Sequence, residues 1–168
     1  MFRCQISLLH ICHHPHRTLS KYWPVRSFGH PLQSHGEYVV HIMNEWYLDA
    51  ANHCSGNFAS DTNEQSVAGL TPTASKVVKP PRIQESAFHM ECKLVDTYEV
   101  PDRKTGQVNA TMVIGEVVMF HVKMEVASES PSGSLVVDIT KGYKPMSRLG
   151  GNMYGTVGDI VDIPRPKV

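Results

Sequence analysis

The sequence lacks most of the signals that assign a function at first reading. No apolar run approaches the roughly 18 residues that a membrane-spanning helix needs. The four cysteines include no C-x-x-C pair, the spacing typical of zinc and redox motifs. There is no G-x-G-x-x-G, no P-loop and no nucleophile elbow, so these dinucleotide and hydrolase motifs are excluded. The formal net charge is zero, which gives no reason to expect nucleic acid or a membrane as a partner.

The first 36 residues contain no acidic side chain. They include four Lys or Arg residues and six His residues, whereas all 16 acids of the chain lie from Glu37 onward. An acid-free, arginine-containing start is typical of a mitochondrial presequence. Prolines at 15, 24 and 31 would interrupt its amphipathic helix, however. With free thiols and 168 residues, we expect one domain in the cytoplasm, with a mitochondrial location as the alternative.

Histidines are frequent but not arranged as a metal site. The tract "HICHHPH" at 10–16 has the composition of a metal-binding segment. It has no second ligand cluster at a fixed spacing, and His41, His53, His89 and His121 are scattered singly along the chain. We therefore interpret the tract as solvated and predict no metal site.

The segment "GEYVVHIMNEWYLDAAN" (36–52) predicts a short strand followed by a helix. Residues 38–40 favour a strand, and the apolar residues from Met43 to Ala51 then recur at spacings of three and four. In the polar segment at 60–83, Asp61 or Thr62 is expected to cap a second short helix, with Glu64 in its first turn. An extended connector follows and ends in a proline pair.

The second half of the chain has a period of two. Apolar residues occupy the even positions of 87–100 and of 112–126, with a turn at 101–107 between these runs. Residues 134–139 add a shorter strand. This pattern predicts a mainly β fold, a small antiparallel sheet curled toward a barrel with one or two helices.

Two residues of the second run need separate comment. Glu116 stands on the apolar face of its strand, where an unpaired carboxylate is costly. It marks a bulge after Gly115, a buried pair with an arginine, or the rim of a pocket. His121 lies on the opposite face of the same strand, and we interpret it as a surface histidine, with a ligand contact as the alternative.

Two stretches have the composition of a ligand site. "AANHCSGNFASD" (50–61) combines small residues with a few polar ones, so its backbone either turns a corner or approaches something flat and large. "SRLGGNMYG" (147–155) has a glycine pair that permits close approach, with Arg148 as a cation and Tyr154 as a flat face with a hydroxyl.

Four blocks in order resemble the flavin reductase-like domain family, the FMN-binding split barrels. They are "GEYVVHIMNEWYLDAANHCSGNF", "GLTPTASKVVKPPRIQESAFHMECKL", "IGEVVMFHV" and "SRLGGNMY", and they cover about residues 36 to 158. The resemblance implies a six-stranded antiparallel split barrel that forms a homodimer, with FMN in a groove near the subunit interface. It also implies an FMN-dependent oxidoreductase that transfers hydride between NAD(P)H and the flavin.

The resemblance further implies which residues contact the cofactor. The loop from Asn52 to Phe58 approaches the flavin, where small side chains leave room for a planar ring. We predict Asn52, Ser55, Gly151 and Tyr154 as cofactor-binding residues. We predict no catalytic acid or base, because the flavin itself carries the chemistry.

The sequence departs from the family upstream of Gly36. The Asn-x-Ala-Pro-[Phe/Tyr]-Ser motif is absent, and the place of the Lys-Asp-Thr motif holds Arg26-Ser27-Phe28. We therefore predict two segments: 1–35, unrelated or disordered, and 36–168, the split-barrel domain, incomplete at its N-terminus. The alternative function is a non-catalytic dimerisation fragment with weak or no FMN binding.

Overall fold

The computed structural model describes residues 36–168, apart from residues 57, 60, 61, 139, 140, 151, 160, 162, 165, 167 and 168. Residues 1–35 lie outside this part, so their unrelated or disordered character stays a prediction, as does the interpretation of the tract at 10–16. The elements are β1 Glu37–His41, η1 Glu45–Tyr47, α2 Leu48–His53, α3 Glu64–Val67, β2 Pro72–Thr73, β3 Arg82–Ile83, β4 Phe88–Pro101, β5 Val108–Val122, η2 Met124–Val126, β6 Ala127–Glu129, β7 Leu135–Val137, β8 Met146–Gly150 and β9 Met153–Thr156.

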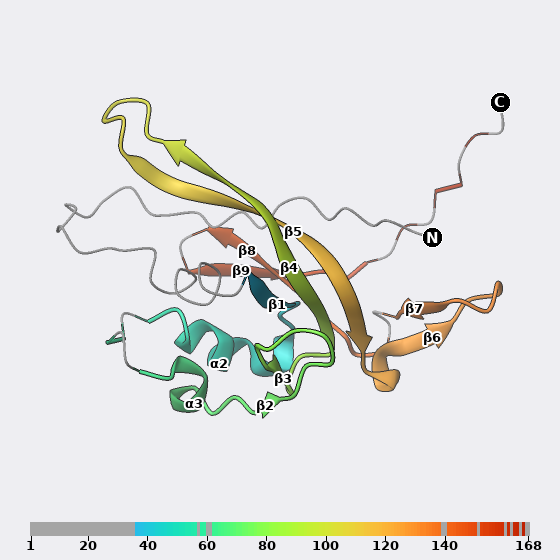
Figure 1. Ribbon diagram of the computed structural model, residues 1–168. Helices are drawn as coiled ribbons and strands as arrows, with labels where there is room; N and C mark the ends of the chain where they lie inside the picture. The colour runs from blue at the N-terminus through green and yellow to red at the C-terminus, as the bar shows by residue number, and fades with distance from the viewer. Residues whose placement is uncertain are drawn as a thin grey trace.

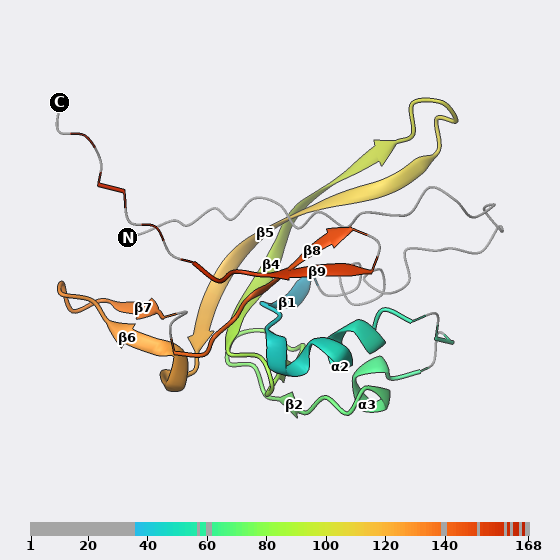
Figure 2. The ribbon, with the colours of Figure 1, turned by 180° about the vertical axis from the view of Figure 1, so that it is seen from behind.

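The centre of the fold is a three-stranded antiparallel sheet in the order β1–β4–β5. Figure 1 shows β4 and β5 as one long, twisted hairpin whose far end projects beyond β1. The pairs β2–β3, β6–β7 and β8–β9 are each two-stranded. The helices and β2–β3 lie to one side of the hairpin's base and β6–β7 to the other, and β8–β9 crosses in front of the hairpin when the molecule is seen from behind (Figure 2).

The predicted mainly β fold is confirmed, and its strands lie where the period of two placed them. β5 nevertheless ends at Val122, and residues 124–126 form the 3-10 helix η2 instead of continuing the strand. Helix α3 is capped by Asn63, whose side chain accepts a hydrogen bond from the Ser66 N–H at 3.1 Å. The prediction of Thr62 as the cap is therefore wrong by one residue, and Asp61 lies outside the described residues. The described helices include none long and apolar enough to cross a membrane.

The base of the hairpin is covered on both faces, unlike its projecting half. Met90 and Cys92 are buried as expected, but His89 and Glu91, at the alternate positions, are buried too, at 4% and 0% exposure. Farther along the hairpin the expected core positions are exposed, among them Tyr98 at 62%. The alternation was therefore correct for the strands and wrong for burial along this arm, because no other element of the described part of the chain covers its apolar face.

Bulges change the register in the middle of the hairpin. Glu91 pairs with Met119 but Cys92 with Val117, so Val118 is an extra residue on β5, and Val95 is the extra residue of a second bulge on β4. Glu116 lies between these irregularities, exposed and opposite Lys93. It is not the buried partner of an arginine, which corrects that alternative.

Gly115 is required by a close approach at this point of the sheet. A Cβ built there would collide with the phenol oxygen of Tyr38 and would lie 3.2 Å from the Lys93 carbonyl oxygen. The ring of Tyr38 therefore lies over a strand position that only glycine can occupy without displacement.

We expect Gly115→Ala to lower the free energy of unfolding by about 1–3 kcal/mol, because the added methyl group forces the Tyr38 ring or the strand to move. Urea unfolding measures this. Gly106→Ala serves as a comparison in which any loss of stability has another cause: a Cβ at Gly106 would meet no atom within 4 Å, but the backbone φ of 69° is one that alanine rarely adopts. In the double variant Gly115→Ala/Tyr38→Ala the Gly115 penalty should largely vanish, and an unchanged penalty would contradict the account.

Candidate functional site

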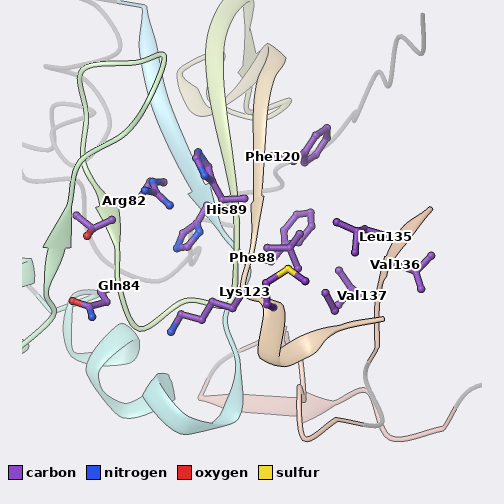
Figure 3. Close-up of a pocket in the computed structure, with 14 residues that line it drawn as sticks. Arg82, Gln84, Phe88, His89, Phe120, Lys123, Leu135, Val136 and Val137 are labelled. Atoms are coloured by element: carbon purple, nitrogen blue, oxygen red, sulfur yellow. The ribbon is translucent and has the colours of Figure 1, made fainter. Parts of the chain in front are cut away.

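A pocket of about 710 Å³ opens at the base of the hairpin, where β4 begins and β5 ends. Its lining comprises Thr73, Arg82, Gln84, Phe88, His89, Phe120, His121, Val122, Lys123, Met124, Ala127, Leu135, Val136 and Val137. Figure 3 shows Arg82 and Gln84 on one side and Leu135–Val137 on the other, with Phe88 between them. The pocket therefore has one polar wall and one apolar wall.

Two cations distinguish the polar part of the lining. Arg82 comes from β3 and Lys123 from the residue that follows β5. The guanidinium of Arg82 is oriented by its donation to the Ala74 carbonyl oxygen, from Nε at 3.2 Å and Nη2 at 2.9 Å. A cavity whose lining holds two positive groups together with aromatic and aliphatic side chains suits a ligand that is partly flat and apolar and partly anionic.

Three histidines lie side by side across the sheet, and two of them, His89 and His121, line the pocket. His41, His89 and His121 are direct cross-strand neighbours on β1, β4 and β5. The rings of His41 and His89 are 5.3 Å apart at 90°, and those of His89 and His121 are 6.1 Å apart at 76°. We call these three residues the histidine ladder.

Two members of the ladder hold the same residue of β3. The Ile83 N–H donates to His41 Nε2 at 3.0 Å, and the Ile83 carbonyl oxygen lies 2.8 Å from His89 Nε2. Burial lowers the pKa of His41 to about 4 and also lowers the pKa of His89, so both rings are neutral at pH 7. His41 therefore carries its proton on Nδ1 and His89 on Nε2.

The carboxylate of Glu91 binds the backbone of residues 76–78, which precede β3 in the chain. Its Oε1 accepts from the Lys76 N–H at 2.8 Å, and its Oε2 accepts from the Val77 and Val78 N–H groups at 2.7 and 3.0 Å. His121 Nε2 lies 2.6 Å from Oε1. Burial would raise the pKa of Glu91, but these hydrogen bonds outweigh it and lower the pKa to about 2.

Residues 75–83, which we call the strap, are thus attached to the sheet by side chains. Glu37 adds one more contact, accepting from the Lys79 N–H at 3.0 Å. Strap backbone groups are bound by four side chains of β1 and β4, namely Glu37, His41, His89 and Glu91. Because Arg82 belongs to the strap, these side chains also fix the polar wall of the pocket.

The residues predicted as cofactor contacts lie elsewhere. Asn52 and Tyr154, 102 residues apart in sequence, meet through a 2.8 Å hydrogen bond from the Tyr154 hydroxyl to Asn52 Oδ1. Arg148 Nη1 donates to the same hydroxyl at 3.1 Å, and the Ser55 hydroxyl donates to the Asn52 carbonyl oxygen at 2.7 Å. Gly151 lies outside the described residues. The three described contacts, Asn52, Ser55 and Tyr154, are not among the residues that line the pocket.

Sequence reasoning missed the residues that build the pocket wall. His121 was interpreted as a surface histidine, which is wrong, because it is largely buried against Glu91 and lines the pocket. The lone histidines at 41, 89 and 121 become neighbours only through the strand register, which the sequence did not give residue by residue. Glu91 gave no local signal, because its odd position agrees with the polar face of an alternating strand.

Comparison with known proteins assigns the family. Residues 7–147 match the sequence model described as the flavin reductase like domain, a match that begins upstream of the predicted boundary at residue 35. The chain belongs to the flavin reductase-like domain family. The resemblance stated from the four sequence blocks is thereby confirmed.

Two curated relatives of this flavin reductase-like domain are uncharacterized proteins. BH2278 of Halalkalibacterium halodurans is 33% identical over 136 residues, which are 81% of this chain and 62% of that protein. YwrF of Bacillus subtilis is 34% identical over 137 residues, 78% of this chain and 62% of that protein. The chain thus spans a little under two thirds of the length of the curated relatives that it matches.

Solved structures of the family share the fold. Nitrilotriacetate monooxygenase component B from Bacillus cereus is similar with a TM-score of 0.69 and 30% identity, over 82% of this chain and 64% of that one. Flavoredoxin of Desulfovibrio vulgaris has a TM-score of 0.64 at 20% identity, over 86% of this chain and 70% of that one. A split barrel of the flavin reductase type is therefore the fold of this chain.

We expect the flavin reductase-like domain to lose stability as the pH falls from 6.5 toward 4. His41 has a folded pKa of about 4 against an ordinary 6.5, so its contribution is complete above 6.5 and decreases by about 3 kcal/mol on the way down. Glu91, with a pKa of about 2, adds a further loss below about 4.5.

Urea unfolding at several pH values, in the wild type and in His41→Gln, tests this expectation. The glutamine still accepts from Ile83 but does not titrate, so the loss between pH 6.5 and 4 should be much smaller. His53→Gln, at an exposed position, is the control that should follow the wild type. Parallel curves for wild type and His41→Gln would show that His41 does not cause the pH dependence.

Proposed function

We propose that this domain binds FMN in the pocket at the base of the β4–β5 hairpin and acts as an oxidoreductase of the flavin reductase type, with NAD(P)H as hydride donor. Membership of the flavin reductase-like family supports a flavin-related oxidoreductase. The observation that carries the proposal is the two-sided lining, with Arg82 and Lys123 on the polar side and Phe88 and Phe120 among the apolar groups.

The described residues fit a flavin nucleotide in size and in chemistry. A volume of about 710 Å³ lies within the range of roughly 300–1,000 Å³ that is usual for small-molecule pockets. Phe88 and Phe120, 5.9 Å apart, offer apolar surface to a ring system, and Arg82 and Lys123 offer donors to a phosphate.

A second sign of fit is a buried polar atom that has no partner in the described chain. His89 Nδ1 makes no hydrogen bond although His89 is 4% exposed and lines the pocket. Because Nε2 carries the proton, Nδ1 is an acceptor, and a ligand with an N–H group could satisfy it. The imide of a flavin is such a group.

In this proposal the flavin carries out the chemistry and the residues of the pocket bind and shield it. When bound, the flavin supplies hydride transfer to and from NAD(P)H, so the protein needs no acid or base of its own. Arg82 and Lys123 would hold the phosphate, and the aromatic and aliphatic wall would exclude water from the ring. Because the rings of His41 and His89 are neutral, they add no positive charge to the polar wall.

Asn52, Ser55, Gly151 and Tyr154 remain our proposed cofactor contacts from the sequence. Asn52 and Tyr154 support this by their mutual hydrogen bond, which gathers an amide, a phenol and the Arg148 guanidinium at one surface. Substitutions at the pocket and at this surface therefore test the two locations of the flavin separately, since Tyr154 is not among the residues that line the pocket.

A homodimer is part of the proposal. Tyr98, Met112 and Ile114 on the projecting half of the hairpin are 62%, 39% and 44% exposed in the single chain. Tyr98 and Met112 are cross-strand partners, so their side chains lie on one face. An apolar face of this kind is typical of a protein contact surface.

The second candidate function is a split-barrel fragment that dimerises without catalysis and binds FMN weakly or not at all. The absence of the Asn-x-Ala-Pro and Lys-Asp-Thr motifs from the sequence favours it. A colourless protein that does not oxidise NAD(P)H in the presence of FMN would support this candidate over the first.

We expect Lys123→Ala to weaken FMN binding by about tenfold to 100-fold, because one charge-assisted hydrogen bond contributes roughly 1.5–3 kcal/mol. Quenching of flavin fluorescence gives the Kd, and NAD(P)H oxidation reports the activity. Lys104→Ala, in the exposed turn at the far end of the hairpin, is the matched control and should bind like the wild type. Equal affinities for the two variants would place the flavin outside this pocket.

A further inference from the structure

Glu91 touches the pocket's lining without being part of it. Its side chain is fully buried, and it is absent from the residues that line the cavity. Yet Oε1 lies 2.6 Å from Nε2 of His121 and 4.0 Å from Nε of Arg82, two lining residues carried by different elements. One carboxylate therefore contacts a lining residue of the strap, Arg82, and a lining residue of β5, His121.

A buried carboxylate is an expensive means of holding a loop. Removing it from water costs several kcal/mol, which its four hydrogen bonds must offset. An apolar side chain near the start of β4 could fill the same space without this cost, although it would leave the three N–H groups of the strap without their acceptor. The charge therefore requires an explanation beyond packing, and the identity of its partners supplies one.

The charge determines which groups can face it. An ionised carboxylate only accepts hydrogen bonds, so Nε2 of His121 must be the donor. A neutral His121 is then fixed as the Nε2–H tautomer, and Nδ1 becomes the lone-pair nitrogen available to a ligand. The same carboxylate binds the three successive N–H groups of Lys76, Val77 and Val78, which locks the strap from which Arg82 extends.

We propose that Glu91 is a positioning residue for the pocket, setting the tautomer of His121 and the place of the strap, so that an acceptor and a cation face the ligand together. In naming the ligand as FMN, the inference rests on the proposed function. The positioning itself is a property of the protein without ligand.

The first test is the tautomer of His121, read from the ¹⁵N shifts of its ring in the full chain. At about pH 9, where imidazole side chains are ordinarily neutral, the wild type should carry the proton on Nε2. In Glu91→Gln a single amide oxygen replaces two acceptors, so the ring should become a mixture of tautomers. Glu116→Gln removes an exposed acid from β5 and should leave His121 as in the wild type.

The second test is the Kd for FMN. Glu91→Gln should raise it by about tenfold or more, whereas Glu116→Gln should stay within about twofold of the wild type. A wild-type ring protonated on Nδ1 would overturn the inference, and this measurement needs no variant, so it holds even where Glu91→Gln does not fold. A Glu91→Gln protein with an unchanged tautomer, or with unchanged FMN affinity, would overturn it as well. Where the wild type binds no FMN, the proposed function fails, and the tautomers still decide whether Glu91 positions the site.

Discussion

The structure depends on the hydrogen bonds between the backbone of the strap and side chains of β1 and β4. Residues 75–83 contain a proline pair and cannot form a continuous ladder. Glu91 and Glu37 bind the N–H groups of residues 76–79, and His41 and His89 bind both polar groups of Ile83. Because the strap covers one face of β1 and β4, the base of the hairpin is buried on both sides. The strap also carries Arg82, so its attachment places the charged wall of the pocket.

The attachment of the strap depends on the protonation states of Glu91 and His41. The strap is held only while Glu91 is ionised and His41 is neutral, and both conditions are met around neutral pH. The neutral ring of His89 adds no charge to the pocket, whose lining includes the cations Arg82 and Lys123. Stability and ligand binding therefore share the same buried residues, which is a reason to expect substitutions there to affect both.

Much of the fold could be predicted from the sequence, and the pocket could not. The strands at 88–101 and 108–122 follow from apolar alternation, and the helix at 48–53 follows from residues three and four apart, because both periods are local properties. The pairing of His41 with His89 and of His89 with His121 depends on register and on bulges at Val95 and Val118, which no local pattern encodes. Glu91 fits the polar face of its alternating strand, so no local pattern distinguished it, whereas Glu116, which breaks the alternation, is exposed. The family resemblance predicts Asn52 and Tyr154 as cofactor contacts, and this role stays a prediction; their hydrogen bond to each other was not predicted.

Amide hydrogen exchange in the unliganded wild type tests the central claim most directly. If side chains of the sheet hold the strap, the N–H groups of Val77, Val78 and Ile83 should exchange nearly as slowly as those in the paired part of β4, because all of them are released only when the sheet opens. The exposed N–H of Lys104 gives the scale for a turn held by one surface carboxylate. Exchange of the three strap amides at the rate of Lys104 or faster would contradict the account.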